Sequence, residues 1–135
     1  MNKKKYTIAQ ILPALNTGGV ERGVVEISKA LVDNNFRSIV ISSGGYMVSQ
    51  VTRNGGIHYD LDVHTKNPLK WSKIRNKLKI ILERENVDLI HFCSRAPAWI
   101  GVPLGAVLDI PIITSVHMRF RKSNVFKKYY TSILT

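Results

Sequence analysis

With 135 residues, of which 44% are hydrophobic, the sequence has the length and composition of one globular domain and excludes a disordered or fibrous chain. Its 20 Lys and Arg against 9 Asp and Glu give a formal net charge of +11, which favours phosphates, nucleic acid or an acidic membrane surface as partners without choosing among them. No apolar run is long enough to span a bilayer, no signal-peptide pattern opens the chain and Cys93 is the single cysteine, so we expect a cytoplasmic protein without an internal disulfide.

The first half of the chain alternates strand and helix patterns. In order, we predict a strand at 6–12, a loop at 13–19, a helix at 20–34, a strand at 37–42, a short helix at 46–53 and a half-exposed strand from 57. In the first helix, the spacing of Val20, Val24, Ile27 and Leu31 predicts one buried face. The glycines after Asn54 predict the end of the short helix.

The second half continues the alternation. We predict a helix from Pro68 to about Glu85, a strand at 88–92, a helix from about Pro97, a strand at 110–116, and a basic, aromatic segment at 119–135 that begins another helix. In the helix that starts at Pro68, we expect Ile74, Leu78, Ile81 and Leu82 to face inward and the lysines to face outward. Because Pro103 lies inside the later helix, we expect a kink or two short pieces there.

Five strands that alternate with helices predict an α/β fold, namely a Rossmann-like, doubly wound parallel sheet with strand order 3-2-1-4-5. Ligands of such sheets bind at the carboxyl ends of the strands, where the order reverses between the first and fourth strands. We therefore expect the loops at 13–19 and 93–96 to face each other across a crevice, with His117 nearby at the end of the fifth strand.

The glycine pair Gly18-Gly19 closes the loop before the first helix. Glycine allows close approach of the backbone to a ligand, and a helix start offers free N–H groups and a positive dipole end. An ordinary tight turn explains the pair equally well. The sequence lacks the three-glycine dinucleotide fingerprint, and no Gly-Lys-Ser/Thr follows to form a P-loop.

Polar side chains near the expected crevice are further candidates. Arg95 could clasp a phosphate or carboxylate, or be a solvated residue at a helix start. His117, at a strand end, has a better functional claim than His91, which lies inside an apolar strand. None of the four histidines (His58, His64, His91 and His117) has the paired spacing of a zinc helix, so we expect no metal site.

The basic residues gather in three places, at 3–5, 66–79 and 119–128. The helix from Pro68, with Trp71 near its start, is either a solvated face or a surface that rests on anionic lipid. The aromatic and basic residues at the end of the chain allow the same two interpretations. We expect no nucleic acid partner, because no recognisable nucleic-acid-binding motif is present.

Three segments together resemble glycosyltransferase family 4. They are ILPALNTGGVERG at 11–23, DLIH at 88–91 followed by SRAPAW at 94–99, and PIITSVH at 111–117. They are similar, in the same order, to the family's first strand with its glycine loop, its fourth strand with the following helix start, and its fifth strand ending in histidine. The resemblance covers nearly the whole chain.

The resemblance implies a GT-B enzyme of two Rossmann-like domains, of which the first binds the acceptor and the second binds most of a nucleotide-sugar. It implies retention of anomeric configuration and catalysis in the cleft without a metal or other cofactor. Gly18 and Gly19 would place amides near the donor phosphate or the acceptor, and His117 would line the catalytic cleft. Stabilisation of the departing nucleotide diphosphate would come mainly from the second domain.

The sequence departs from the family in three respects. Met118 follows His117 where glycine is common, Cys93 stands where many members have a second histidine, and the second domain with its glutamate pair is absent. We expect residues 1–135 to be the acceptor-side domain of a glycosyltransferase, incomplete at its C-terminus and inactive alone. A cell-envelope glycan or glycolipid is the expected acceptor, with the alternative of a non-catalytic module that binds an anionic glycolipid or the inner face of a membrane.

Overall fold

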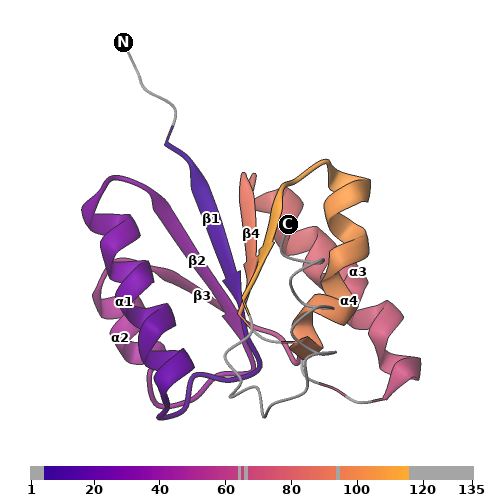
Figure 1. Cartoon of the computed structure of the whole chain (residues 1–135), viewed down its shortest axis with the longest axis horizontal. Coiled ribbons are helices and arrows are strands. Elements are labelled where there is room, and N and C mark those ends of the chain that lie inside the picture. Colours follow the sequence, from indigo (N-terminus) through magenta and orange to yellow (C-terminus); the bar gives the residue numbers. More distant parts are fainter. Residues whose placement is uncertain (1–4, 64, 66, 94, 116–135) are drawn as a thin grey trace, which may run out of the picture.

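A computed structural model describes residues 5–63, 65, 67–93 and 95–115, without the side chains of 95–99 and 102. The elements, in order, are β1 (Thr7–Ile11), α1 (Gly19–Asp33), β2 (Arg37–Ser42), α2 (Val48–Arg53), β3 (Ile57–Asp60), α3 (Pro68–Arg84), β4 (Leu89–Phe92), α4 (Arg95–Leu108) and β5 (Ile112–Thr114). Figure 1 shows α1 and α2 on one face of the sheet and α3 and α4 on the other. The helix and strand positions therefore agree with the alternation predicted from the sequence.

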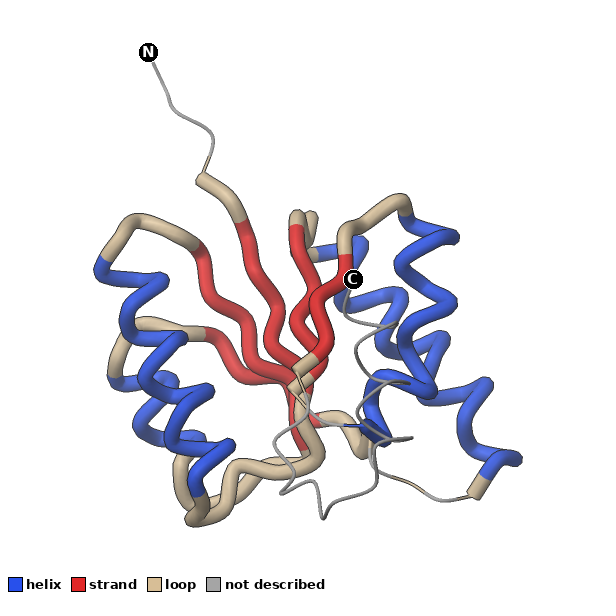
Figure 2. The backbone as a smooth tube through the Cα atoms, viewed as in Figure 1, coloured by secondary structure: helices blue, strands red, loops and turns tan. Residues whose placement is uncertain are grey.

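The five strands form one parallel sheet with the order β3-β2-β1-β4-β5, which confirms the predicted topology. β1 is the central strand and pairs with β2 through Ile11↔Ile41 and with β4 through Ile11↔Phe92. The carboxyl ends of β1, β2 and β4 consequently meet at one edge of the sheet (Figure 2). We call this the C-terminal edge and the opposite one the N-terminal edge.

Two apolar layers, one on each face of the sheet, hold the helices. The larger layer joins the sheet to α3 and α4, and its fully buried members include Ile39, Leu78 and Phe92. The smaller layer lies under α1 and α2 and includes Leu15 and Val51. Central strands buried on both faces explain why β1, β2 and β4 are nearly continuous apolar runs.

The buried face of α1 is rotated from the predicted one, although Val24 is buried and Val20 packs against the same layer, as predicted. Ile27 is 43% exposed, whereas Val24, Val25 and Ser28 are buried. Two hydrogen bonds explain the rotation: Ser28 Oγ lies 2.7 Å from Ser38 Oγ, and Gln10 Nε2 donates to the Val24 carbonyl at 3.2 Å. Apolar spacing alone misplaced this face, because buried polar groups that bond one another also pack against the sheet.

The inward face of α3 was predicted correctly. Ile74, Leu78 and Leu82 are buried, and Ile81 packs at the margin of the same layer. The helix starts after Asn67, whose side chain accepts a hydrogen bond from the Leu69 N–H at 3.0 Å, and it has proline at its first position. Both features are helix start signals that the sequence carries.

α4 starts at Arg95, two residues before the predicted start, and continues through Pro103, so the expectation of two short pieces is wrong. Close packing holds it as one helix. A Cβ added at Gly101 would overlap the Phe92 ring, and one added at Gly105 would overlap Ile112. The helix lies directly on β4 and β5, and the Ile100 carbonyl accepts a hydrogen bond from Arg75 Nε at 2.7 Å.

Candidate functional site

The C-terminal edge is built from the residues that follow β1, β2, β4 and β5. The Cys93 N–H donates to the Ile11 carbonyl at 2.8 Å, and the Ser115 N–H donates to the Phe92 carbonyl at 2.9 Å. The chain therefore leaves β4 against the end of β1, and leaves β5 against the end of β4. The edge where the strand order reverses is thus assembled as the topology predicted.

Backbone hydrogen bonds fasten the loop after β1 to the loop after β2. The Leu15 N–H donates to the Gly44 carbonyl at 2.8 Å, and the Met47 N–H donates to the Leu15 carbonyl at 2.8 Å. Both the N–H and the hydroxyl of Ser43 donate to the Pro13 carbonyl, at 2.9 and 2.7 Å. The two loops form one fastened unit beside the start of α1.

Gly45 makes this close approach possible. Its φ is +141°, a conformation that side chains rarely adopt, and an added Cβ would lie 2.5 Å from the Leu15 carbonyl oxygen. Nothing in the predicted elements, a strand at 37–42 and a helix at 46–53, indicated this role of Gly45. Two adjacent glycines directly after a buried strand were the available signal.

Gly18 and Gly19 are exposed at the start of α1. Gly18 is extended, with φ 175°, so its backbone does not require glycine, and nothing lies within 4 Å of a Cβ added at Gly19. No side chain caps the helix, so its first N–H groups remain available at the C-terminal edge. Gly19 therefore leaves open space at the helix start, whereas Gly18 makes room for a neighbouring side chain.

The Glu21 carboxylate lies against Gly18, since a Cβ added there would overlap it. A negative charge in the first turn complements the positive end of the helix dipole. An anionic group that binds at this helix start must therefore displace the Glu21 side chain. A sugar hydroxyl, in contrast, can donate a hydrogen bond to the same carboxylate.

His58 and Ser42 support the loop after β2. His58 Nε2 lies 2.7 Å from Ser42 Oγ, and this oxygen accepts the Gly44 N–H at 3.1 Å. Burial lowers the pKa of His58 below its ordinary value of 6.5, and the nearby Asp60 charge opposes that shift. His58 is therefore biased toward the neutral form and acts as an indirect support for the glycine loop.

His91 and Cys93 are structural groups. His91 Nε2 lies 2.9 Å from Ser115 Oγ, which fits the prediction of a satisfied histidine inside a strand. Burial raises the pKa of the Cys93 thiol to about 12, so the thiol stays protonated and is a poor nucleophile. Within the described residues, no three His, Cys, Asp or Glu side chains gather as a metal site would need, and the expectation of a metal-free site stays a prediction.

The predicted site residues are only partly placed. Gly18 and Gly19 lie at the C-terminal edge, and Arg95 is the first residue of α4, at the end of β4. The side chain of Arg95, all of His117 and the segment at 119–135 lie outside the described residues. The structure thus brings the loop after β1 near the start of α4, and the roles of Arg95 and His117 stay predictions.

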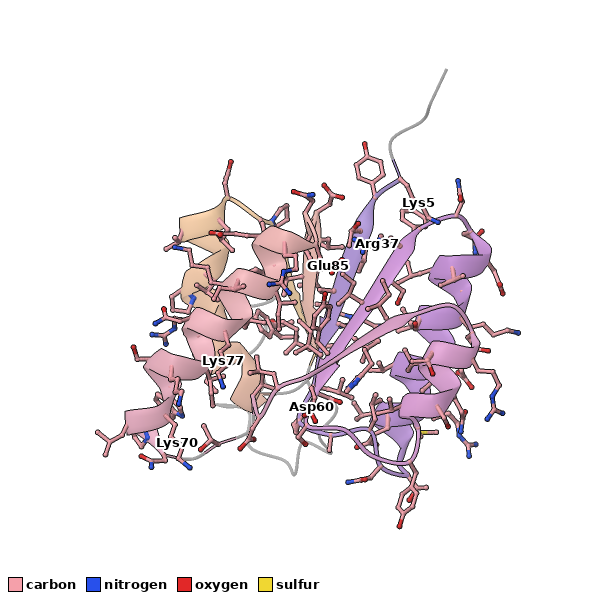
Figure 3. The ribbon with its side chains drawn as sticks, turned by 180° about the vertical axis from the view of Figure 1, so that it is seen from behind. Lys5, Arg37, Asp60, Lys70, Lys77 and Glu85 are labelled. Atoms are coloured by element: carbon pink, nitrogen blue, oxygen red, sulfur yellow. The ribbon has the colours of Figure 1, made fainter. Side chains whose placement is uncertain are left out.

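A hollow of about 650 Å³ lies at the opposite, N-terminal edge. Lys5, Thr7, Arg37, Glu85 and Asp88 are among its lining residues, and Figure 3 shows Lys5, Arg37 and Glu85 at that end of the molecule. Several of these polar groups are bonded to one another or to a neighbouring residue. Arg37 pairs with Glu85, Tyr59 donates to Glu85, and Asp88 accepts the Thr7 N–H at 2.8 Å. We interpret it as a structural clamp.

None of the helices in the described part of the chain is long and apolar enough to cross a bilayer.

The sequence model described as Glycosyltransferase Family 4 matches residues 17–135. The chain is similar to the crystal structure of a glycosyltransferase from Rickettsia africae ESF-5, with 36% identity and a TM-score of 0.80, over 98% of this chain and 35% of that one. MurG from Acinetobacter baumannii superimposes with a TM-score of 0.68 and 15% identity, over 96% of this chain and 39% of MurG.

A putative UDP-N-acetylglucosamine 2-epimerase from Listeria monocytogenes superimposes with a TM-score of 0.59 and 13% identity. At such low identity, the epimerase and MurG show a shared fold alone. This chain spans between 35% and 39% of the length of all three structures. No curated protein sequence matches it.

Proposed function

The chain belongs to Glycosyltransferase Family 4, and we propose that it forms the acceptor-side portion of a retaining enzyme that transfers a sugar from a nucleotide-sugar to a cell-envelope glycan or glycolipid. The observation that supports this most is the family match together with the GT-B-like sheet order. Because the chain spans 35% of the Rickettsia enzyme, we propose that donor binding is completed by further sequence and that residues 1–135 alone transfer nothing.

The C-terminal edge would supply position and polarity. The exposed start of α1 at Gly18 and Gly19 offers N–H groups to the donor diphosphate or to the acceptor. Glu21 would move aside for a phosphate, or accept a hydrogen bond from a sugar hydroxyl. The loops held by Gly45 keep this helix start fixed relative to the end of β4, which favours a preorganised site.

Charge stabilisation would depend on side chains at the ends of β4 and β5. As the departing nucleotide diphosphate gains negative charge, Arg95 at the start of α4 would attract it. His117, two residues beyond Ser115, would contact the sugar or its acceptor in the cleft. We propose no metal or cofactor for this step.

Calorimetric titration of the protein as its source cells make it, with a panel of UDP-, GDP- and ADP-linked sugars, tests the proposal. An immunoblot against the N-terminal region first establishes the mass of that protein, because a band well above 15.2 kDa identifies a longer transferase. We expect saturable binding of at least one nucleotide-sugar, weakened by substitution of His117 with alanine. No binding by any member of the panel would reject the proposal.

A second candidate function is a non-catalytic module for an anionic glycolipid or membrane surface. It is favoured by the formal net charge of +11. Salt-sensitive sedimentation with anionic liposomes, without affinity for any nucleotide-sugar, would support this alternative over the transferase. We expect no nucleic acid partner, and a gel shift at low salt would reveal one.

A further inference from the structure

The outer face of α3 combines basic and aliphatic side chains. We call this face the α3 stripe, and its members are Leu69, Lys70, Lys73, Lys77, Ile80 and Arg84. Leu69 is 90% exposed and Ile80 is 54% exposed. The four basic members are also exposed. Single exposed aliphatic side chains are ordinary on a protein surface, but two that share one basic helix face give that face the two features of a lipid-contacting surface.

The stripe is one continuous surface. Leu69 and Ile80 lie about three helical turns apart and therefore point in nearly the same direction. This direction is opposite to Ile74, Leu78 and Leu82, which the sheet buries. Glu83, the acidic residue of α3, lies 3.9 Å from Lys79, so its charge is partly balanced by a lysine outside the stripe.

The stripe begins at the end of the molecule that holds the candidate site. α3 begins after β3, so Leu69 and Lys70 lie at the end of the molecule that holds the C-terminal edge. Figure 3 shows Lys70 at the same end as Asp60, the last residue of β3, with Lys77 further along the helix toward Glu85. A planar surface that contacts the stripe along its length would therefore reach the end of the molecule at which these loops lie.

We propose that the α3 stripe docks this protein on an anionic lipid bilayer, with Leu69 and Ile80 entering the interface and the basic side chains at the level of the lipid phosphates. Long basic side chains suit this arrangement because their stems lie along apolar material while their charges stay hydrated. The two exposed aliphatic side chains favour lipid over nucleic acid, which would gain nothing from them.

Docking on a bilayer adds a location to the proposed function. It rests on that proposed function for one point, the glycolipid acceptor. A lipid-linked acceptor is held at the bilayer surface, so an enzyme docked through α3 meets it by diffusion in two dimensions. The charged stripe would supply orientation, because it combines exposed cations with exposed aliphatic side chains on one face of α3.

Vesicle sedimentation tests the proposal with the full chain and no nucleotide-sugar. We expect binding to phosphatidylcholine vesicles that contain phosphatidylglycerol, a large loss on raising the salt concentration, and little binding to phosphatidylcholine alone. Equal binding to neutral and anionic vesicles, or binding to neither, would overturn the proposal. Because the assay contains no donor, its result is independent of the calorimetry that tests transferase function.

A matched pair of charge variants distinguishes binding through the α3 stripe from binding through the overall positive charge. The triple variant K70E/K73E/K77E and the control R22E/K29E/R53E change the net charge equally, and the control residues are exposed on α1 and α2 across the sheet. We expect the stripe variant to lower the vesicle partition coefficient at least about tenfold and the control to lower it about twofold. Equal losses in both would contradict a specific docking face.

The aliphatic members need their own test. The double variant L69S/I80S should weaken anionic vesicle binding about tenfold at a salt concentration where the charges are screened, whereas Ile27→Ser, at an exposed position of α1, should not. Circular dichroism verifies that each variant is folded, and exposed positions make unfolding an unexpected outcome. Unchanged binding of the double variant, or a stripe that instead binds RNA in a gel shift, would overturn lipid docking.

Discussion

The two edges of the sheet are held together by different kinds of contact. At the N-terminal edge, side chains pair with one another: Glu85 is buried, pairs with Arg37 and accepts the Tyr59 hydroxyl. At the C-terminal edge, backbone groups of two loops pair with each other through Leu15 and Gly44, and the first N–H groups of α1 stay available. The polar side chains of the N-terminal edge thus serve stability, whereas the uncapped start of α1 leaves backbone N–H groups at the C-terminal edge open to the ligand that we propose.

At the N-terminal edge, structural contacts account for both a hollow and shifted pKa values. The hollow of about 650 Å³ and the shifted carboxyl and phenol both belong to the N-terminal edge. The hydrogen bond from Tyr59 lowers the pKa of Glu85, and the same bond raises the pKa of Tyr59. Structural ion pairs shift pKa values as strongly as catalytic ones do.

The largest effect on stability is expected from Glu85→Ala. It removes the carboxylate that accepts the Tyr59 hydroxyl and pairs with the partly exposed Arg37, and it should lower the free energy of unfolding by about 2.5 kcal/mol. Urea unfolding measures the change. Glu83→Ala, which removes an exposed pair at 3.9 Å, is the control and should cost less than about 0.5 kcal/mol. Equal costs would show that the N-terminal edge is not the clamp.

Gly45→Ala should lower the free energy of unfolding by about 2 kcal/mol, because the added methyl meets the Leu15 carbonyl at a φ of +141°. Since the distortion moves the loop at 13–19, it should also weaken nucleotide-sugar binding in calorimetry. Glu85→Ala, in contrast, should leave binding by the folded fraction unchanged. Loss of binding in both variants would contradict the proposal that the C-terminal edge binds the ligand independently of the N-terminal edge.

Gly19→Ala separates binding from folding within the C-terminal edge. Nothing lies near the added methyl, so the free energy of unfolding should change by less than about 0.5 kcal/mol. The methyl reduces the space in front of the helix start, and the affinity for the nucleotide-sugar should fall about tenfold, or about 1.4 kcal/mol. Unchanged affinity would mean that Gly18-Gly19 is an ordinary turn, the alternative that the sequence left open.

The smallest effect concerns His58. Burial lowers its pKa in the folded state, so the unfolded chain binds the proton more tightly. The contribution of His58 to stability is therefore complete above its ordinary pKa of 6.5 and is lost as the pH falls below that value. His58→Gln should flatten this part of the urea-midpoint profile and cost about 1 kcal/mol at pH 7 through the Ser42 hydrogen bond. An unchanged profile would exclude His58 as the titrating group.

Much of the fold could be predicted from the spacing of apolar residues and from the prolines and glycines that bound the helices. Pro68 marked the start of α3, and the glycines after Asn54 marked the end of α2. The alternation of strands and helices predicted the order of the strands in the sheet. The face of α1 could not be predicted from apolar spacing, because Ser28 is buried through its contact with Ser38, which lies on another element. The continuity of α4 through Pro103 likewise depends on close packing of Gly101 against Phe92.

The position of the candidate site in the fold could be predicted from the sequence, but not all of the residues that build it. The strand order located the C-terminal edge, and the glycine pair at Gly18 located the start of α1. The role of Gly45 could not be predicted, because it depends on a carbonyl from a loop about thirty positions earlier in the chain. The ion pair of Arg37 with Glu85 is equally non-local, and sequence spacing does not report such contacts.

Hydrogen exchange of the protein as its cells make it, with and without the nucleotide-sugar that calorimetry selects, tests the contrast between the edges most directly. If the C-terminal edge holds the ligand, amide protection will rise at residues 13–21 and 43–47 and stay unchanged at residues 85–88. Protection that rises at 85–88 and not at 13–21 would contradict this and place the ligand at the N-terminal edge.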